Sequence, residues 1–195
     1  MSTVKRVFLI HGWDGRPDNH WFPWLKNELE RRDLLAGRHG FKVESLEMPN
    51  PARPKVSEWT RKIRESVGEP MESDYFVGHS LGCVTILRYI EKLSENVKIG
   101  GCVFVGGFSG NINIPEIAEF YSLPLDIEEV KKHCDGFVTI FSDNDEYIPQ
   151  SESLSFSNKL GATQVFERNK GHFCKSDGVT ELPSALSAIL DFSRS

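Results

Sequence analysis

The sequence lacks any long hydrophobic run. Its first apolar stretch, residues 7–10, gives way to the polar pair His11-Gly12 and has no small-residue cleavage site, so it is too short for a secretory signal. No stretch approaches the roughly 18 consecutive apolar residues that a membrane-spanning helix requires. We therefore expect a cytoplasmic protein that makes no contact with a membrane.

Cysteine and positive charge are also scarce. The four cysteines form no Cys-x-x-Cys pair, which argues against a zinc knuckle or a thioredoxin-type redox site and favours buried free thiols. Lysine and arginine number 23 against 28 aspartate and glutamate residues, which gives a net charge of -5. This balance lacks the basic surface that nucleic-acid binding requires. We expect no nucleic-acid partner, no metal and no cofactor.

What the chain does contain is an alternation of short apolar runs with helical patterns. Its 195 residues suit a single domain, residues 1–195, and the alternation is typical of an α/β fold with a mostly parallel central sheet of about six strands. The expected strands are residues 4–10, 41–48, 74–78, 99–105, 137–142 and 163–167. The expected helices are about 19–32, 57–67 with Ser57 as its cap, 81–93 and 183–192, with shorter ones at 114–120 and 125–132.

A G-x-S-x-G motif, Gly78 to Gly82, stands directly between an expected strand and an expected helix. A turn this sharp strains the backbone at Ser80, and only small residues at positions 78 and 82 leave room for it. The hydroxyl would then be exposed above the sheet, and the helix N-terminus would supply N–H groups for an oxyanion. The alternative is an ordinary glycine-rich strand end with an exposed serine, and the flanking strand and helix favour the nucleophile.

A serine nucleophile needs a base and an orienting acid, and both follow later strands. Strand 137–142 leads into the acidic run that begins with Asp143 and Asp145, and strand 163–167 leads into His172. The order Ser80, acid, His172 is that of α/β-hydrolases. Either aspartate could serve from the residues alone, while a calcium loop is excluded because Ile148 stands where an EF-hand requires glycine.

Two further features belong to the same sheet edge. The turn after the first strand, at Trp13, and the residue after the nucleophile, Leu81, would supply the two backbone N–H groups of an oxyanion hole, although an ordinary strand-to-helix turn would look the same. His79 would pack under the serine, and His11 would brace a turn. The side chains expected in the substrate pocket are Trp13, Trp21, Phe22, Phe108, Ile148 and Phe173, although aromatic residues near a helix start more often belong to the core.

Together these motifs resemble a known family: the small α/β-hydrolase-fold serine hydrolases that include bacterial YdeN and the mammalian retinoblastoma-binding serine hydrolase. The resemblance also covers residues 19–25, 48–51 and 181–183 and so runs through nearly the whole chain. It implies that Ser80 is the nucleophile and His172 the base. It favours Asp145 over Asp143, because the family's acid begins a D-x-x-aliphatic-Pro stretch like residues 145–149.

The resemblance further implies a compact core that lacks the first two strands and any large cap domain. One departure concerns partners: the retinoblastoma-binding relative has a Leu-x-Cys-x-Glu motif, and the nearest match here ends in Thr85 instead of Glu. We therefore do not expect a retinoblastoma-type partner.

The sequence thus predicts a serine hydrolase of the carboxylesterase type, EC 3.1.1, that acts on a small-molecule acyl substrate through an acyl-enzyme. Thioesters and aminoacyl amides remain open because the same triad cleaves them. The rival is a non-catalytic, hydrolase-like module for binding or protein interaction. A nucleotide-binding domain is disfavoured because no phosphate-binding glycine motif follows the first strand. Residues 108–134 are long enough to shade a pocket but too short for a large lid.

Overall fold

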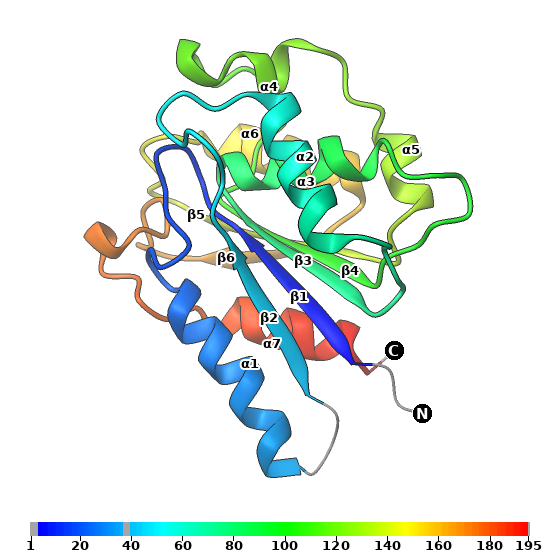
Figure 1. Cartoon of the computed structure of the whole chain (residues 1–195). Coiled ribbons are helices and arrows are strands. Elements are labelled where there is room, and N and C mark those ends of the chain that lie inside the picture. The colour runs from blue at the N-terminus through cyan, green and yellow to red at the C-terminus, as the bar shows by residue number, and fades with distance from the viewer. Residues whose placement is uncertain (1–3, 37–39, 195) are drawn as a thin grey trace.

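The computed structural model describes residues 4–36 and 40–194, and a parallel β-sheet lies at its centre (Figure 1). Six strands of the described chain pair in the order β2-β1-β3-β4-β5-β6, and every neighbouring pair is parallel. The strands are β1 Lys5–Ile10, β2 Phe41–Leu46, β3 Asp74–His79, β4 Gly101–Val105, β5 Phe137–Ser142 and β6 Thr163–Glu167. The expected mostly parallel sheet of about six strands is confirmed.

Helices cover both faces of the sheet (Figure 1). One face carries α1 Phe22–Ala36 and α7 Pro183–Phe192, and the other carries α2 Val56–Val67, α3 Leu81–Ile90, α4 Glu119–Ser122, α5 Ile127–Lys132 and α6 Gln150–Leu160. Side chains along β1 alternate between the two hydrophobic cores: Val7 and Leu9 face α1 and α7, whereas Phe8 and Ile10 face the other layer. This alternation is the period of two that a strand buried on both faces requires.

Several expected helix bounds need correction. The first helix begins at Phe22 rather than near Asn19, because His20 has a positive φ of 56° that a right-handed helix does not allow. It also continues to Ala36, beyond the expected end at residues 31–32. Ser57 does not cap α2: the helix begins one residue earlier, and its N-cap Lys55 makes no side-chain capping bond. The helix expected over 81–93 ends at Ile90.

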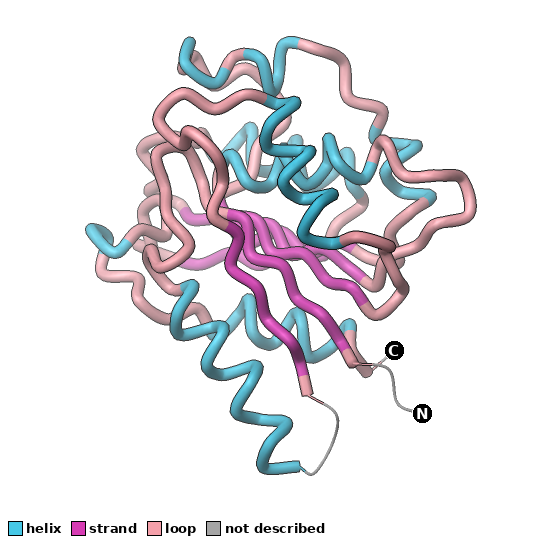
Figure 2. The backbone as a smooth tube through the Cα atoms, viewed as in Figure 1, coloured by secondary structure: helices cyan, strands magenta, loops and turns pink. Residues whose placement is uncertain are grey.

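Because all six strands are parallel, their carboxyl ends meet at one edge of the sheet, where long loops gather (Figure 2). The loops after β1, β3, β4, β5 and β6 all leave this edge, and open α/β sheets hold their ligands there. The central strands β3, β4 and β5 are buried along their whole length, so they give that edge a rigid base. Among the described residues, no helix is long and apolar enough to cross a membrane.

Candidate active site

Ser80 occupies a strained turn between β3 and α3. Its φ of 54° and ψ of -118° lie outside the favourable regions for a residue with a side chain, and its N–H donates to the Val105 carbonyl at 2.9 Å. A Cβ at Gly82 would lie 2.1 Å from a backbone oxygen of β1, and one at Gly78 would lie 2.7 Å from the backbone of α3. The close approach of strand, turn and helix therefore requires glycine at both positions, as the motif predicted.

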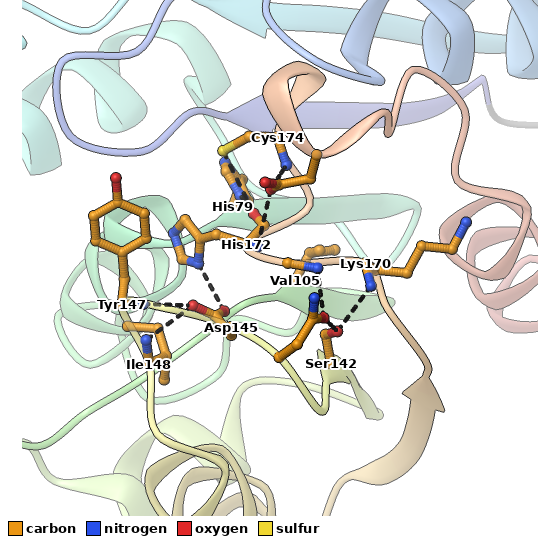
Figure 3. Close-up of polar contacts among 12 residues, drawn as sticks. His79, Val105, Ser142, Asp145, Tyr147, Ile148, Lys170, His172 and Cys174 are labelled. Carbon is orange, nitrogen blue, oxygen red and sulfur yellow. Dashed lines mark hydrogen bonds and ion pairs between the residues drawn. The ribbon is translucent and has the colours of Figure 1, made fainter.

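The loops after β5 and β6 bring a carboxylate against an imidazole (Figure 3). Asp145 Oδ2 lies 2.7 Å from His172 Nδ1, and Asp145 Oδ1 accepts from the Tyr147 and Ile148 N–H groups at 2.9 Å each. The two side chains are only 3% and 9% exposed. Because Nδ1 donates to the carboxylate, Nε2 is left as the acceptor, which is the tautomer that a general base needs.

Asp143, the other candidate acid, lies elsewhere. Its Oδ1 accepts a hydrogen bond of 2.8 Å from the Asn169 N–H, so it holds the base loop by its backbone. The structure thus brings Asp145, and not Asp143, to the imidazole.

A cavity of about 330 Å³ opens beside these groups. Ser80 and His172 both line it, together with Trp13 and Ile148. Within residues 4–36 and 40–194, the Ser80 hydroxyl forms no hydrogen bond, with His172 or with any other group. Nucleophile–base hydrogen bonds are often long before substrate binds, so this arrangement is compatible with a serine that the imidazole can reach.

Two backbone N–H groups beside the nucleophile turn have no partner among the residues that the structure describes. The N–H groups of Trp13 and Leu81 have no acceptor in the described chain, although the neighbouring N–H groups of Asp14 and Ser80 are both paired. The turn that carries Trp13 lies against the nucleophile, since a Cβ at Gly12 would come within 3.0 Å of Ser80 Cβ. The Trp13 indole is anchored by its own hydrogen bond to the Ala52 carbonyl. Unpaired backbone donors close to a nucleophile are what an oxyanion hole requires.

Four of the six side chains expected in the pocket lie in the core instead. Trp21, Phe22, Phe108 and Phe173 are at most 1% exposed and are not among the residues that line the cavity. Large aromatic side chains gain most from complete burial, and these four belong to the two hydrophobic cores on either face of the sheet.

The cavity wall is built largely from residues that the sequence did not single out. Ile112, Ile114 and Ile117 come from the segment after β4, and Tyr147 comes from the acid loop, where its ring lies 5.0 Å from the His172 ring. The Ile-x-Ile-x-x-Ile pattern is visible in the sequence as a group of apolar residues. Its spacing of two and then three residues matches neither the period of a strand nor that of a helix, so it did not indicate a cavity wall. Asp14, Asn19, His20 and Cys174 complete the polar side of the wall.

A buried histidine supports the backbone of the base. His79 is 3% exposed and its Nε2 lies 2.7 Å from the His172 carbonyl oxygen, so Nε2 carries the proton and donates it. Burial, and then the charges of His172 and His20, hold the pKa of His79 well below its usual 6.5. His79 therefore stays neutral and lies under the nucleophile turn, as expected.

His11 and His20 also have lowered pKa values, chiefly because of burial. His11 donates from Nδ1 to the Gly12 carbonyl at 2.8 Å and accepts from the Met48 N–H through Nε2, so it braces the turn after β1 as expected. His20 Nδ1 accepts from the Lys175 N–H at 2.9 Å, which joins the loop before α1 to the base loop. In the part of the chain that the structure describes, no three His, Cys, Asp or Glu side chains are grouped so that they could hold a metal ion.

The chain is similar to known proteins over nearly its whole length. Residues 7–191 match the family model described as "Serine hydrolase". The chain is 31% identical over 190 residues to the "Putative hydrolase YdeN" of Bacillus subtilis (strain 168), covering 97% of this chain and 96% of that protein. The "Serine hydrolase RBBP9" of Rattus norvegicus is 23% identical over 175 residues, 88% of each chain. The crystal structure of the Bacillus subtilis ydeN gene product has a TM-score of 0.90 and 30% identity, with 98% of this chain and 100% of that one covered.

Proposed function

The chain belongs to the serine hydrolase family and has the α/β-hydrolase fold, and from this premise we propose that it hydrolyses small carboxylic esters through a Ser-His-Asp triad. In this proposal Ser80 is the nucleophile, His172 is the general base and acid, and Asp145 holds the imidazole in the required tautomer. The observation that carries the proposal is the 2.7 Å contact between Asp145 Oδ2 and His172 Nδ1, which orients an imidazole in the same cavity as a strained, accessible serine.

The reaction proceeds in two halves. Ser80 Oγ attacks the ester carbonyl carbon while its proton passes to His172 Nε2, and the N–H groups of Trp13 and Leu81 stabilise the negative oxygen. The tetrahedral intermediate then expels the alcohol, which takes the proton from Nε2, and leaves an acyl group on Ser80. Water repeats the sequence: it loses a proton to Nε2, attacks the acyl carbon and releases the carboxylic acid as the proton returns to Ser80.

The cavity wall supports a short, uncharged acyl group. Four isoleucines line it, and among the described lining residues there is no lysine or arginine to pair with an anionic substrate. Asp14 is the lining residue with an acidic side chain, so an acyl chain with its own carboxylate would be repelled. Trp13 and Tyr147, 36% and 55% exposed, form an aromatic rim where the alcohol portion would leave.

A fluorophosphonate probe tests the proposal without knowledge of the natural substrate, because it reacts only with an activated serine. Mass spectrometry should locate the adduct on Ser80, and the adduct should be absent in Ser80→Ala. Ser151→Ala, which alters an exposed serine at the start of α6, should be labelled like the wild type. A second assay measures the hydrolysis of short-chain p-nitrophenyl esters. A folded wild-type protein that is not labelled and that cleaves no such ester would favour the non-catalytic binding module.

A further inference from the structure

The acid loop and the base loop are joined by consecutive hydrogen bonds beyond the end of the sheet. The backbone ladder between β5 and β6 stops at the pair Ser142 and Glu167, and from there the side chains of the acid loop continue the pairing. Three successive N–H groups of the base loop donate to the side chains of residues 142–144, though not in sequence order: Asn169 to Asp143 Oδ1 at 2.8 Å, Lys170 to Ser142 Oγ at 3.0 Å and Gly171 to Asn144 Oδ1 at 2.8 Å. The contact between Asp145 and His172 is the fourth in this row (Figure 3).

Asn144 takes part in two of the hydrogen bonds that hold these loops. Its Oδ1 accepts from the Gly171 N–H, directly before His172, and also from the Ser142 hydroxyl at 2.8 Å. An amide oxygen has two acceptor sites, so both bonds can form together. The Ser142 hydroxyl in turn accepts from the Lys170 N–H. Because Asn144 accepts the proton of this hydroxyl, it also orients the oxygen that Lys170 contacts.

The other side of the base loop is held by Asp177. Its Oδ2 accepts from the His172 N–H at 3.0 Å and from the Cys174 N–H at 2.9 Å. His79 holds the His172 carbonyl. The backbone of His172 is therefore fixed at its N–H and its C=O, and the position of the residue before it depends on Asn144.

We propose that Asn144 is a positioning residue, which sets the base loop so that His172 Nδ1 meets Asp145. The inference rests on the proposed function for its catalytic consequence, and on the hydrogen bonds alone for its structural part. A neutral acceptor suits the place, because a carboxylate there would put further negative charge beside Asp145 and overstabilise the imidazolium. Asn144 is exposed, so its replacement removes an anchor without opening a cavity in the core.

Three variants test the role. Asn144→Ala removes both acceptor bonds and should lower kcat about 10–100-fold, the usual cost of losing the group that orients a functional side chain, with KM within about twofold. Asn144→Asp keeps both acceptor sites and should recover most of kcat, while its added charge moves the acid limb of the kcat/KM pH profile to higher pH. Asn158→Ala is the matched control: Asn158, near the C-terminal end of α6, is another exposed asparagine whose Oδ1 accepts a side-chain hydrogen bond, from Gln164.

Two results would overturn the proposal. One is wild-type kcat and pH profile in Asn144→Ala, and the other is an equal loss in the Ala and Asp variants, which would mean that the acceptor bonds are irrelevant. A purely structural role would lower the melting temperature and leave the pH profile unchanged.

Failure of the proposed function is distinguishable from failure of this inference. If wild-type Ser80 takes no fluorophosphonate and no ester is cleaved, crystal structures of the wild type and Asn144→Ala give the answer instead. The inference then requires the Asp145–His172 contact to lengthen or break in the variant, and an unchanged contact would refute it.

Discussion

Gly106 lies against the edge of the His172 imidazole. A Cβ at position 106 would come within 3.1 Å of His172 Cε1 and 3.2 Å of Nδ1, and 3.6 Å from Asp145 Oδ2. Gly106 follows β4, the strand between the nucleophile and the acid in the sheet order, and has a positive φ of 55°. The end of β4 thus forms a surface on which the base and the acid meet.

Gly106→Ala should therefore damage the site more than the fold. The methyl group would displace the imidazole by a few tenths of an ångström, and we expect kcat/KM to fall about 10-fold, since misplacement of a reacting group by a full ~1 Å costs about 100-fold. The positive φ should cost about 1–2 kcal/mol of stability as well. Gly161→Ala is the control, since Gly161 has a φ of 64° with nothing within 4 Å of the added Cβ. It should lose similar stability and no activity; equal kinetic losses in both variants would argue against the contact.

The two candidate acids separate by mutation. Asp145→Asn should lower kcat about 10⁴-fold, because an amide that faces Nδ1 as a donor favours the wrong tautomer. Asp143→Asn should change kcat no more than about threefold, since an amide oxygen can still accept from the Asn169 N–H. Steady-state kinetics on a p-nitrophenyl ester measures both. The reverse pattern would assign the acid to Asp143.

The isoleucine wall should limit acyl length. Ile114→Ala enlarges the cavity. We expect the kcat/KM for p-nitrophenyl hexanoate, relative to that for p-nitrophenyl butyrate, to rise about tenfold. The reason is that each of the two additional methylenes gains roughly 0.8 kcal/mol when it is buried. Ile127→Ala, another half-buried isoleucine that does not line this cavity, serves as the control. An unchanged ratio in Ile114→Ala would place the acyl chain elsewhere.

Stability should fall in mild acid. The pKa of His79 is lowered by burial from its usual 6.5, so below pH 6.5 the unfolded chain binds a proton that the folded chain does not. The contribution of His79 is complete above pH 6.5 and is lost as the pH falls towards its folded pKa, up to about 2 kcal/mol at pH 5. His11 and His20 act in the same direction. Urea unfolding between pH 5 and 8 measures the slope, which should be shallower in His79→Gln; an identical slope would show that His79 is not involved.

Much of this protein is determined by local sequence. Apolar alternation and run length predicted all six strands, because a strand buried on both faces must be apolar along its length. The turn at Ser80 was predictable because the glycines that permit it stand two residues before and two residues after the serine, in one local motif. The helix bounds were less accurate. The positive φ at His20 and the i→i−3 hydrogen bonds that follow the end of α3 depend on surrounding contacts rather than on periodicity.

Only the tertiary structure decided which groups meet in the site. Asp143 and Asp145 are two residues apart and chemically equal, and in the sequence only the family resemblance favoured Asp145. The contacts themselves depend on the pairing of β5 with β6, which sets Asp145 opposite His172 and Asp143 opposite Asn169. The isoleucines of residues 112–117 form part of the cavity wall, whereas four of the expected aromatic side chains are buried in the core. Periodicity and propensity describe a chain's nearest neighbours, whereas a site depends on distances between loops, and these are set by strand order and packing.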